Sequence, residues 1–251
     1  MASVINGKKL AIICPLLNCL DYTRQMLRSI PPVADYGLVF INNGSTDGTE
    51  AYLKVYSKSP DAIVKNYTEN KGVAHAWNTG INLAIKKWDS EAYLIINNDI
   101  LFHRVTIKKM LEALEEKDVL LVSANNVKDK LNSPEALEQF IPPLMQDFRE
   151  CPDFSCFMMK KEALVSVGYF DEKFYPAYYE DNDYHYRINM AGKRALNINT
   201  ASYYHFGSQT IKNGEEVKRL SNANYLKNKE YYESKWGGPP GQEIYTRPFN
   251  K

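Results

Sequence analysis

Five short apolar runs recur through the first half of the chain, and stretches with helical patterning separate them. We expect β-strands at residues 10–14, 38–42, 62–66, 92–97 and 119–125. We expect helices between them at residues 22–29, 47–57, 73–86 and 105–117. Strands and helices that alternate in this way predict a mostly parallel central sheet with helices on both faces, because each crossover places a helix against the sheet. The predicted fold class is therefore α/β.

The second half of the chain is less regular. We expect a strand at residues 154–160 and helices at residues 162–167, 182–190 and 215–235. The segment from Val127 to Pro152 includes "PEALEQFIPPLMQDF", whose three prolines favour a surface loop or a lid over a regular element. No repeat, low-complexity tract or Gly/Ser linker divides the chain, so residues 1–251 are expected to form a single domain.

Charge and cysteine content disfavour several classes of protein. The 31 basic and 30 acidic residues give a net charge of +1, so no overall field attracts the chain to nucleic acid or anionic lipid. No apolar run approaches the roughly 18 to 20 residues that a membrane span needs, and residues 1–10 lack the apolar segment of a signal peptide. Cys14 and Cys156 lie in or beside apolar runs, which favours buried free thiols in a reducing compartment. The predicted location is cytoplasmic.

Polar residues follow four of the predicted strands. They are Pro15 and Asn18 after the first strand, residues 42–49 ("NNGSTDGT") after the second, residues 70–72 after the third and residues 97–99 ("NND") after the fourth. The carboxyl ends of parallel strands meet at one edge of a sheet, where ligands bind between the loops. The sequence contains neither GxGxxG nor GxxxxGK[ST], so these two phosphate-binding loops are not predicted. The edge is more typical of a nucleoside pocket, although Ser45 or Asp47 can equally cap a helix.

The carboxylate of Asp99 stands at the end of the fourth strand. It is either a solvated turn residue or a ligand of Mg²⁺ or Mn²⁺, which bind through one or two carboxylates together with substrate phosphates. Asn97 and Asn98 would add amide groups without adding charge. His205 follows a later β-type run and is either a packed histidine or a second ligand of the same cation.

A second acidic cluster lies in "YYEDNDYHYR". Glu180, Asp181 and Asp183 stand near the start of a predicted helix, beside Tyr178 and Tyr179. Acidic residues in a first helical turn gain about 0.3–1 kcal/mol from the helix dipole, which explains a single acid as a cap. Three acids among tyrosines indicate a mixed aromatic and carboxylate surface instead. One crowded carboxylate there would have a raised pKa and act as a general base.

The order of these segments resembles that of family 2 glycosyltransferases of the GT-A fold, a Rossmann-like α/β fold, and especially their rhamnosyltransferase-like branch. The resemblance rests on "CPLLN", "INNGSTDGT", "NKGVAHAWNTGI", "YLIINNDI", "GYFDEKFYPAYYEDNDYHYRINMAGKR" and a histidine followed by "KWGG", and it extends over about residues 9–237. It implies an inverting transfer of a sugar from a nucleotide-diphosphate donor to an acceptor hydroxyl. Residues of about 9–125 would bind the donor, and residues of about 126–236 would supply the acceptor and catalytic groups.

The resemblance also implies a role for individual residues. Asp181 would be the general base with Glu180 beside it, and Asp99 and His205 would hold a divalent cation, Mn²⁺ or Mg²⁺. Asp183, Tyr178 and Tyr179 would face the acceptor. The donor would be bound by Pro15, Asn18, Asn42, Asn43, Asp47, Gly72, Asn78, Asn97 and Asn98.

Two departures from the family pattern affect these expectations. Asparagines 42 and 43 stand where many members use an aspartate to contact the base, so UDP-, dTDP- and GDP-linked donors all stay open. The metal motif has one acid where many members have two, which leaves room for a reduced metal requirement. The acceptor can be a glycan, a protein or a hydroxylated nucleobase, and the oligomeric state is open. A nucleotidyltransferase that makes nucleotide-sugars and a non-catalytic nucleotide-sugar or glycan-binding module are the alternative functions.

Overall fold

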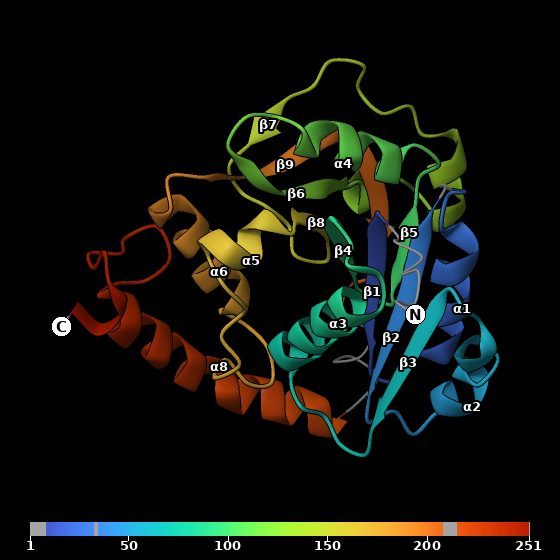
Figure 1. Cartoon of the computed structure of the whole chain (residues 1–251), viewed down its shortest axis with the longest axis horizontal. Helices are drawn as coiled ribbons and strands as arrows, with labels where there is room; N and C mark the ends of the chain where they lie inside the picture. The colour runs from blue at the N-terminus through green and yellow to red at the C-terminus, as the bar shows by residue number, and fades with distance from the viewer. Residues whose placement is uncertain (1–8, 33–34, 208–214, 251) are drawn as a thin grey trace, which may run out of the picture.

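A nine-stranded sheet runs through the centre of the molecule (Figure 1). The computed structural model describes residues 9–32, 35–207 and 215–250, with only the backbone for residues 215–222 and 250. The strands are β1 (Leu10–Leu16), β2 (Tyr36–Asn43), β3 (Ala62–Tyr67), β4 (Ala92–Ile96), β5 (Ile100–Phe102), β6 (Val119–Asn126), β7 (Phe148–Arg149), β8 (Cys156–Lys160) and β9 (Arg194–His205). Their order in the sheet is β3-β2-β1-β4-β8-β6-β9-β5, and β7 pairs with β9.

The sheet has a parallel half and a mixed half. Strands β3, β2, β1 and β4 are parallel, as the alternating sequence pattern predicts. Strand β8 then inserts antiparallel between β4 and β6, β6 and β9 are parallel, and β5 lies antiparallel to β9. The two predicted parts of the chain, 9–125 and 126–236, therefore contribute strands to the same sheet.

Helices cover both faces of the sheet, and each face has its own hydrophobic cluster. Helices α1 (Leu20–Ser29), α2 (Thr49–Leu53) and α4 (Thr106–Leu114) pack on one face. Helices α3 (Val73–Trp88), α5 (Glu162–Ser166) and α6 (Glu180–Met190) pack on the other. The long helix α8 (Glu215–Trp236) lies across the lower side of the molecule in Figure 1 and packs on α6 through an aromatic cluster.

Strand β1 shows why these residues form a buried strand. Ile12 and Cys14 belong to the cluster beneath α1 and α4, whereas Ala11 and Ile13 belong to the cluster beneath α3. A strand covered on both faces is apolar at every position, which is the pattern of the sequence. Helix α3 approaches closely because Gly80 faces Ile13, so that a side chain at this position would collide with Ile13. The small and apolar face of α3 therefore packs on the sheet.

Two predicted helices are shorter in the structure. The helix expected at residues 47–57 is limited to α2, and a separate 3₁₀ turn follows at Tyr56–Lys58. Asp47 lies just before α2. Its carboxylate accepts hydrogen bonds from the backbone N–H and the hydroxyl group of Thr49, the first residue of the helix. The helix expected at residues 105–117 ends at Leu114, shortly before Asp118 with its positive φ of 61°. Between residues 127 and 152 the chain forms 3₁₀ turns at Lys128–Lys130 and Pro134–Gln139 and the short strand β7, and a last 3₁₀ turn spans Pro248–Asn250.

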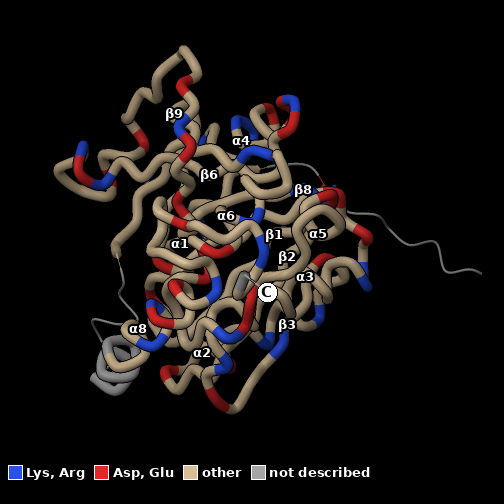
Figure 2. Tube along the Cα trace, turned by 90° about the vertical axis from the view of Figure 1, so that its left-hand side faces the viewer, with Lys and Arg blue, Asp and Glu red and all other residues tan. Residues whose placement is uncertain are grey.

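The distribution of surface charge and the burial of the cysteines are those expected from the sequence. Figure 2 shows basic and acidic residues interspersed along the trace, without a face of one sign in this view. All four cysteines are free thiols, and Cys14 and Cys156 are buried as expected. Burial raises the pKa of both buried thiols, which keeps them protonated and unreactive. Within the described ranges, no helix combines the length and the hydropathy that crossing a bilayer requires.

Candidate active site

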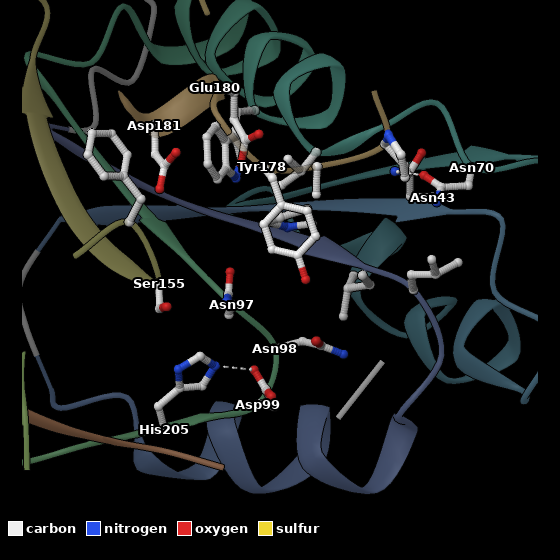
Figure 3. A pocket seen from close by; sticks show the side chains of 18 of the residues that line it. Asn43, Asn70, Asn97, Asn98, Asp99, Ser155, Tyr178, Glu180, Asp181 and His205 are labelled. Carbon is white, nitrogen blue, oxygen red and sulfur yellow. Dashed lines mark hydrogen bonds and ion pairs between the residues drawn. The ribbon is translucent and has the colours of Figure 1, made fainter. Parts of the chain in front are cut away.

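A cavity of about 340 Å³ opens at the carboxyl ends of β1, β2 and β4. The start of α6 and the segment before β8 close its other side, so residues from both halves of the chain line it. Figure 3 shows its polar side chains, with amide groups toward one end, carboxylates toward the other and a histidine–aspartate pair below. Of the predicted site residues, the cavity is lined by Pro15, Asn43, Asn97, Asn98, Asp99, Tyr178, Glu180, Asp181 and His205.

Asn43, at the end of β2, ties that strand to the loop before α3. Its Nδ2 donates to Oδ1 of Asn70 at 2.9 Å and to the carbonyl of Gly72 at 3.2 Å. Its Oδ1 accepts from the backbone N–H of Lys71 at 2.9 Å. Asn43 and Asn70 both line the cavity (Figure 3). These bonds fix the amide end of the cavity.

Asn42 and Asn78 are predicted donor contacts that the structure places elsewhere. Neighbouring residues of a strand point to opposite sides, and Asn42 accordingly points away from Asn43 and donates to Asn66 at 3.0 Å. Asn78 is buried and holds the segment before α6, because its Nδ2 donates to the carbonyl of Phe170 at 2.9 Å. Neither side chain is among those that line the cavity.

Asn18, Asp47 and Gly72 also lie outside the cavity lining, and they shape its loops instead. Oδ1 of Asn18 accepts from the backbone N–H of Thr46 at 2.7 Å, and Asp47 accepts from that of Leu20 at 2.8 Å, so the loops after β1 and β2 are joined. Gly72 has a φ of +90° and precedes α3, a conformation that favours glycine.

Asp99 lies in the turn between β4 and β5, as the sequence predicts. Asp99 is 4% exposed, and its Oδ1 lies 3.0 Å from Nε2 of His205. The two residues meet because β5 pairs antiparallel with β9, which sets Ile100 opposite His205. Beside them, Asn98 donates to the carbonyl of Asn18 at 3.0 Å and so is held in the loop after β1.

The Asp99–His205 pair fits a divalent cation that is shared with a substrate. Within the described ranges, no group of three or more His, Cys, Asp or Glu side chains is arranged to hold a metal. Mg²⁺ sites that include substrate phosphates need only one or two protein ligands. Asp99 and His205 supply an oxygen and an imidazole nitrogen, which are side-chain ligands that Mn²⁺ accepts. Their 3.0 Å distance from Oδ1 to Nε2 is that of a hydrogen bond, so the two groups lie close enough to share one ligand.

Glu180 and Asp181 begin helix α6 after an unusual turn. Tyr178 and Tyr179 both have positive φ, 79° and 75°, which is costly for bulky residues and is found mainly where the surrounding structure imposes it. Asn228 of α8 imposes it here, because its Nδ2 donates to the carbonyls of Ala177 at 2.9 Å and Tyr178 at 3.1 Å. The turn aims Tyr178 and both acids toward the cavity (Figure 3).

The two acids have raised pKa values. Burial raises the pKa of Asp181 above its ordinary value, and the negative charge of Asp153 adds to this, whereas backbone N–H groups oppose it. Burial raises the pKa of Glu180 well above its ordinary value, and the charge of Asp181 adds to this. Oε2 of Glu180 has no hydrogen-bond partner among the residues that the structure describes. Such a buried polar atom costs about 1–3 kcal/mol.

Asp183 and Tyr179, which were predicted as acceptor-side residues, are not among the residues that line the cavity. Asp183 is fully buried between α6 and α8, where Nζ of Lys235 lies 2.6 Å from it and Nε of Arg187 lies 2.8 Å from it. Residues two apart on a helix lie on different faces, so Asp183 points away from Asp181. Tyr179 is 8% exposed and packs in the aromatic cluster of α8 with Tyr232.

Asp153 is a cavity residue that the sequence did not indicate. It accepts a bond from the hydroxyl of Tyr203 at 2.6 Å and one from the backbone N–H of Ser155 at 2.8 Å. It lies just before β8, beside the end of β4, because β8 runs antiparallel to β4. A motif search cannot find Asp153, because the residue reaches the cavity only through the antiparallel direction of β8.

The cavity is acidic. Four carboxyl groups line it, those of Asp99, Asp153, Glu180 and Asp181, and the described lining includes no lysine or arginine. Ionised carboxylates repel a diphosphate, and a divalent cation that accompanied it would reduce this repulsion. The composition of the cavity therefore favours a ligand that carries its own divalent cation.

Comparison with known proteins identifies the family. The sequence profile described as "Glycosyl transferase family 2" matches residues 11–174. A galactofuranosyl glycosyltransferase of Leishmania donovani is 32% identical over 76 residues, which is 30% of this chain and 17% of that protein. Glycosyltransferase GlyA of Streptococcus pneumoniae is 34% identical over 76 residues, which is 30% of this chain and 11% of that protein. The matched region thus spans less than a fifth of either relative.

Solved structures show the same fold at low identity. The mannosyltransferase PcManGT from Pyrobaculum calidifontis, in complex with GDP-Man and Mn²⁺, has a TM-score of 0.61 and 20% identity over 88% of this chain and 64% of that one. GalNAc-T7 with UDP, GalNAc and Mn²⁺ has a TM-score of 0.63 and 12% identity over 94% and 52%. S. aureus TarS 1-349 has a TM-score of 0.55 and 17% identity over 89% and 69%. These likenesses confirm the GT-A fold, and the profile match shows that the chain belongs to glycosyl transferase family 2.

Proposed function

We propose that the chain is an inverting glycosyltransferase, which moves a sugar from a nucleotide-diphosphate donor to the hydroxyl group of an acceptor. The observation that carries the proposal is that one cavity holds both the Asp99–His205 pair and the half-buried carboxyl group of Asp181 (Figure 3). The reaction breaks the bond between the sugar and the diphosphate and forms a bond between the sugar and the acceptor oxygen. It needs one group beside the leaving diphosphate and another beside the attacking hydroxyl.

The donor side of the proposal rests on the first half of the chain. Asn70 stands at the amide end of the cavity, where Asn43 fixes its side chain, and its amide group can bond the edge of a nucleobase or a ribose. Two similar structures contain GDP-Man and UDP, each with Mn²⁺. Asp99 and His205 would hold Mn²⁺ or Mg²⁺, which neutralises the charge of a leaving diphosphate when bound. The absence of lysine and arginine from the described lining predicts that donor binding requires this cation.

The acceptor side rests on Asp181. A hydroxyl group is a weak nucleophile at neutral pH, so a carboxylate that accepts its proton during attack contributes a rate factor of ~10²–10⁴. The raised pKa of Asp181 makes it a stronger proton acceptor than an exposed aspartate. A single displacement, with base and leaving group on opposite faces of the sugar, inverts the anomeric configuration.

The proposal also covers the division of labour along the chain and its location. Residues 9–125 would bind the donor and residues 126–236 would supply the catalytic and acceptor groups. The buried thiols of Cys14 and Cys156 are consistent with a cytoplasmic enzyme. The structure offers no observation that favours a nucleotidyltransferase or a non-catalytic binding module.

Donor hydrolysis tests the proposal. The purified chain is incubated with UDP-, dTDP- and GDP-sugars in Mn²⁺, Mg²⁺ or EDTA, and release of the nucleoside diphosphate is measured. We expect one donor class to be consumed with a cation and not with EDTA. Asp99→Ala should weaken cation-dependent donor binding by more than about tenfold in calorimetry. The exposed Asp129→Ala is the matched control and should bind as the wild type does. Absence of binding and turnover with every donor would refute the proposal.

A further inference from the structure

Two buried polar atoms of the cavity residues have no hydrogen-bond partner among the residues that the structure describes. They are Nε1 of Trp77 and Oε2 of Glu180, in residues that are 2% and 6% exposed. Both residues line the cavity. The other buried side-chain atoms in this state belong to Ser90, His103 and Ser202, which do not line it. Folded proteins satisfy nearly all buried polar groups, so an open donor and an open acceptor in one cavity indicate a polar ligand.

Aromatic packing holds Trp77 in place. Its ring stacks on Phe154, with centroids 6.3 Å apart and planes at 29°, and it meets Phe157 and Phe170 edge-on at 5.3 and 4.8 Å. Phe154 also lines the cavity. A fixed indole N–H beside an aromatic wall suits a sugar ring, which presents C–H groups on a face and hydroxyl groups at its edge.

The position of Glu180 agrees with a sugar ligand. In Figure 3 Glu180 lies between Asp181 on one side and the amide end with Asn43 on the other. The sugar being transferred must lie between the general base and the nucleotide. This step rests on the proposed glycosyl transfer, which assigns Asp181 to the acceptor and the amide end to the nucleoside.

We propose that Trp77 and Glu180 form the subsite that recognises a hydroxyl group of the transferred sugar. The indole N–H of Trp77 donates to the hydroxyl oxygen, and the hydroxyl proton is donated to Oε2 of Glu180. A site built to bond a hydroxyl group rejects an analogue that lacks it, because its own polar atoms then stay buried without partners. The two residues therefore select donors that carry this hydroxyl group over the corresponding deoxy sugars.

Deoxy analogues of the donor test the subsite. The best donor from the hydrolysis panel is compared with its 2-, 3-, 4- and 6-deoxy forms, and kcat/KM is measured for each. For the wild type, one analogue should lose about tenfold or more. For Trp77→Phe, the intact donor should lose about tenfold and that analogue should lose nothing further, so the penalty for the missing hydroxyl disappears. Glu180→Ala repeats the cycle at the acceptor atom.

Trp88→Phe is the matched control. Trp88 lies on the same helix, is 3% exposed and is not part of the cavity lining. This variant should keep the wild-type penalty for the deoxy analogue. The subsite is refuted if no analogue is penalised in the wild type, or if the variants at positions 77 and 180 lose the same factor for the intact donor and all its analogues. If the wild type consumes no donor at all, the proposed function itself fails.

Discussion

Replacement of Asp183 by asparagine is expected to weaken the junction between α6 and α8. The Asp183 side chain is fully buried and accepts from Nε of Arg187 at 2.8 Å and from Nε1 of Trp236 at 2.9 Å. Nζ of Lys235, in a side chain that is 8% exposed, lies 2.6 Å from Oδ1 of Asp183. Asparagine keeps the shape of the side chain and removes its charge, so two cations lose a buried partner.

The structure sets the size of this effect. Removing one partner of a buried ion pair costs about 3–5 kcal/mol. Lys235 keeps a second carboxylate, because Oδ2 of Asp171 lies 2.7 Å from its Nζ. Arg187 keeps two bonds to backbone carbonyls. We therefore expect a loss at the lower end, about 3 kcal/mol in the free energy of unfolding, which lowers Tm by roughly 6–12 °C for a chain of this size.

Urea unfolding followed by circular dichroism measures this loss. Asp171→Asn is the matched control, because the Asp171 side chain is 20% exposed and Lys235 would keep Asp183 as its partner. The control should lose less than half as much as Asp183→Asn. A loss below about 1 kcal/mol for Asp183→Asn, within the range of exposed ion pairs, would refute the account of the junction. An equal loss for both variants would do the same.

Three further predictions concern the site and the core. Asp153→Asn removes a charge that raises the pKa of Asp181, so the acid limb of the kcat–pH profile should move to lower pH; an unmoved limb would show that the two do not interact. Glu180→Gln should raise the free energy of unfolding at neutral pH, because a raised pKa in the folded state means that ionised Glu180 destabilises the fold. In urea titrations this gain should vanish as the pH falls below 4.5, the ordinary pKa of a glutamate. A gain that does not depend on pH would contradict the prediction. Gly80→Ala places a methyl group against Ile13 and should cost about 1–3 kcal/mol, so an unchanged Tm would argue against the close approach of α3 to β1.

Local patterns were sufficient to predict most of the parallel half of the sheet. The apolar runs of β1 and β4 are buried on both faces, and buried parallel strands are apolar throughout. The position of Asp99 follows from the end of β4, since the chain leaves the sheet where the apolar run stops. His205 is 106 residues away from Asp99 in the sequence. Their contact depends on the pairing of β5 with β9, which no local pattern encodes.

The predicted site residues that lie outside the cavity lining do so for geometric reasons. Asn42 and Asn43 are adjacent in β2, and a strand turns one of two neighbours away from any given side, so only one can face the cavity. Asp181 and Asp183 stand two positions apart on α6, and the helix turns them to different faces. Asp153 was not predicted as a site residue. It reaches the cavity because β8 inserts antiparallel beside β4. Motif order was informative about which segments form the site and less so about which side chains point into it.

The most direct test of the proposed mechanism is the comparison of Asp181→Asn with the wild type in both turnover and donor binding. Asparagine keeps the shape of the side chain and cannot accept a proton as a carboxylate does. The account predicts that kcat falls by a factor of ~10²–10⁴, while the Kd of the donor with Mn²⁺ changes by less than about twofold, because the group acts only during attack by the acceptor. Transfer by Asp181→Asn at the wild-type rate would contradict the assignment of Asp181 as the general base.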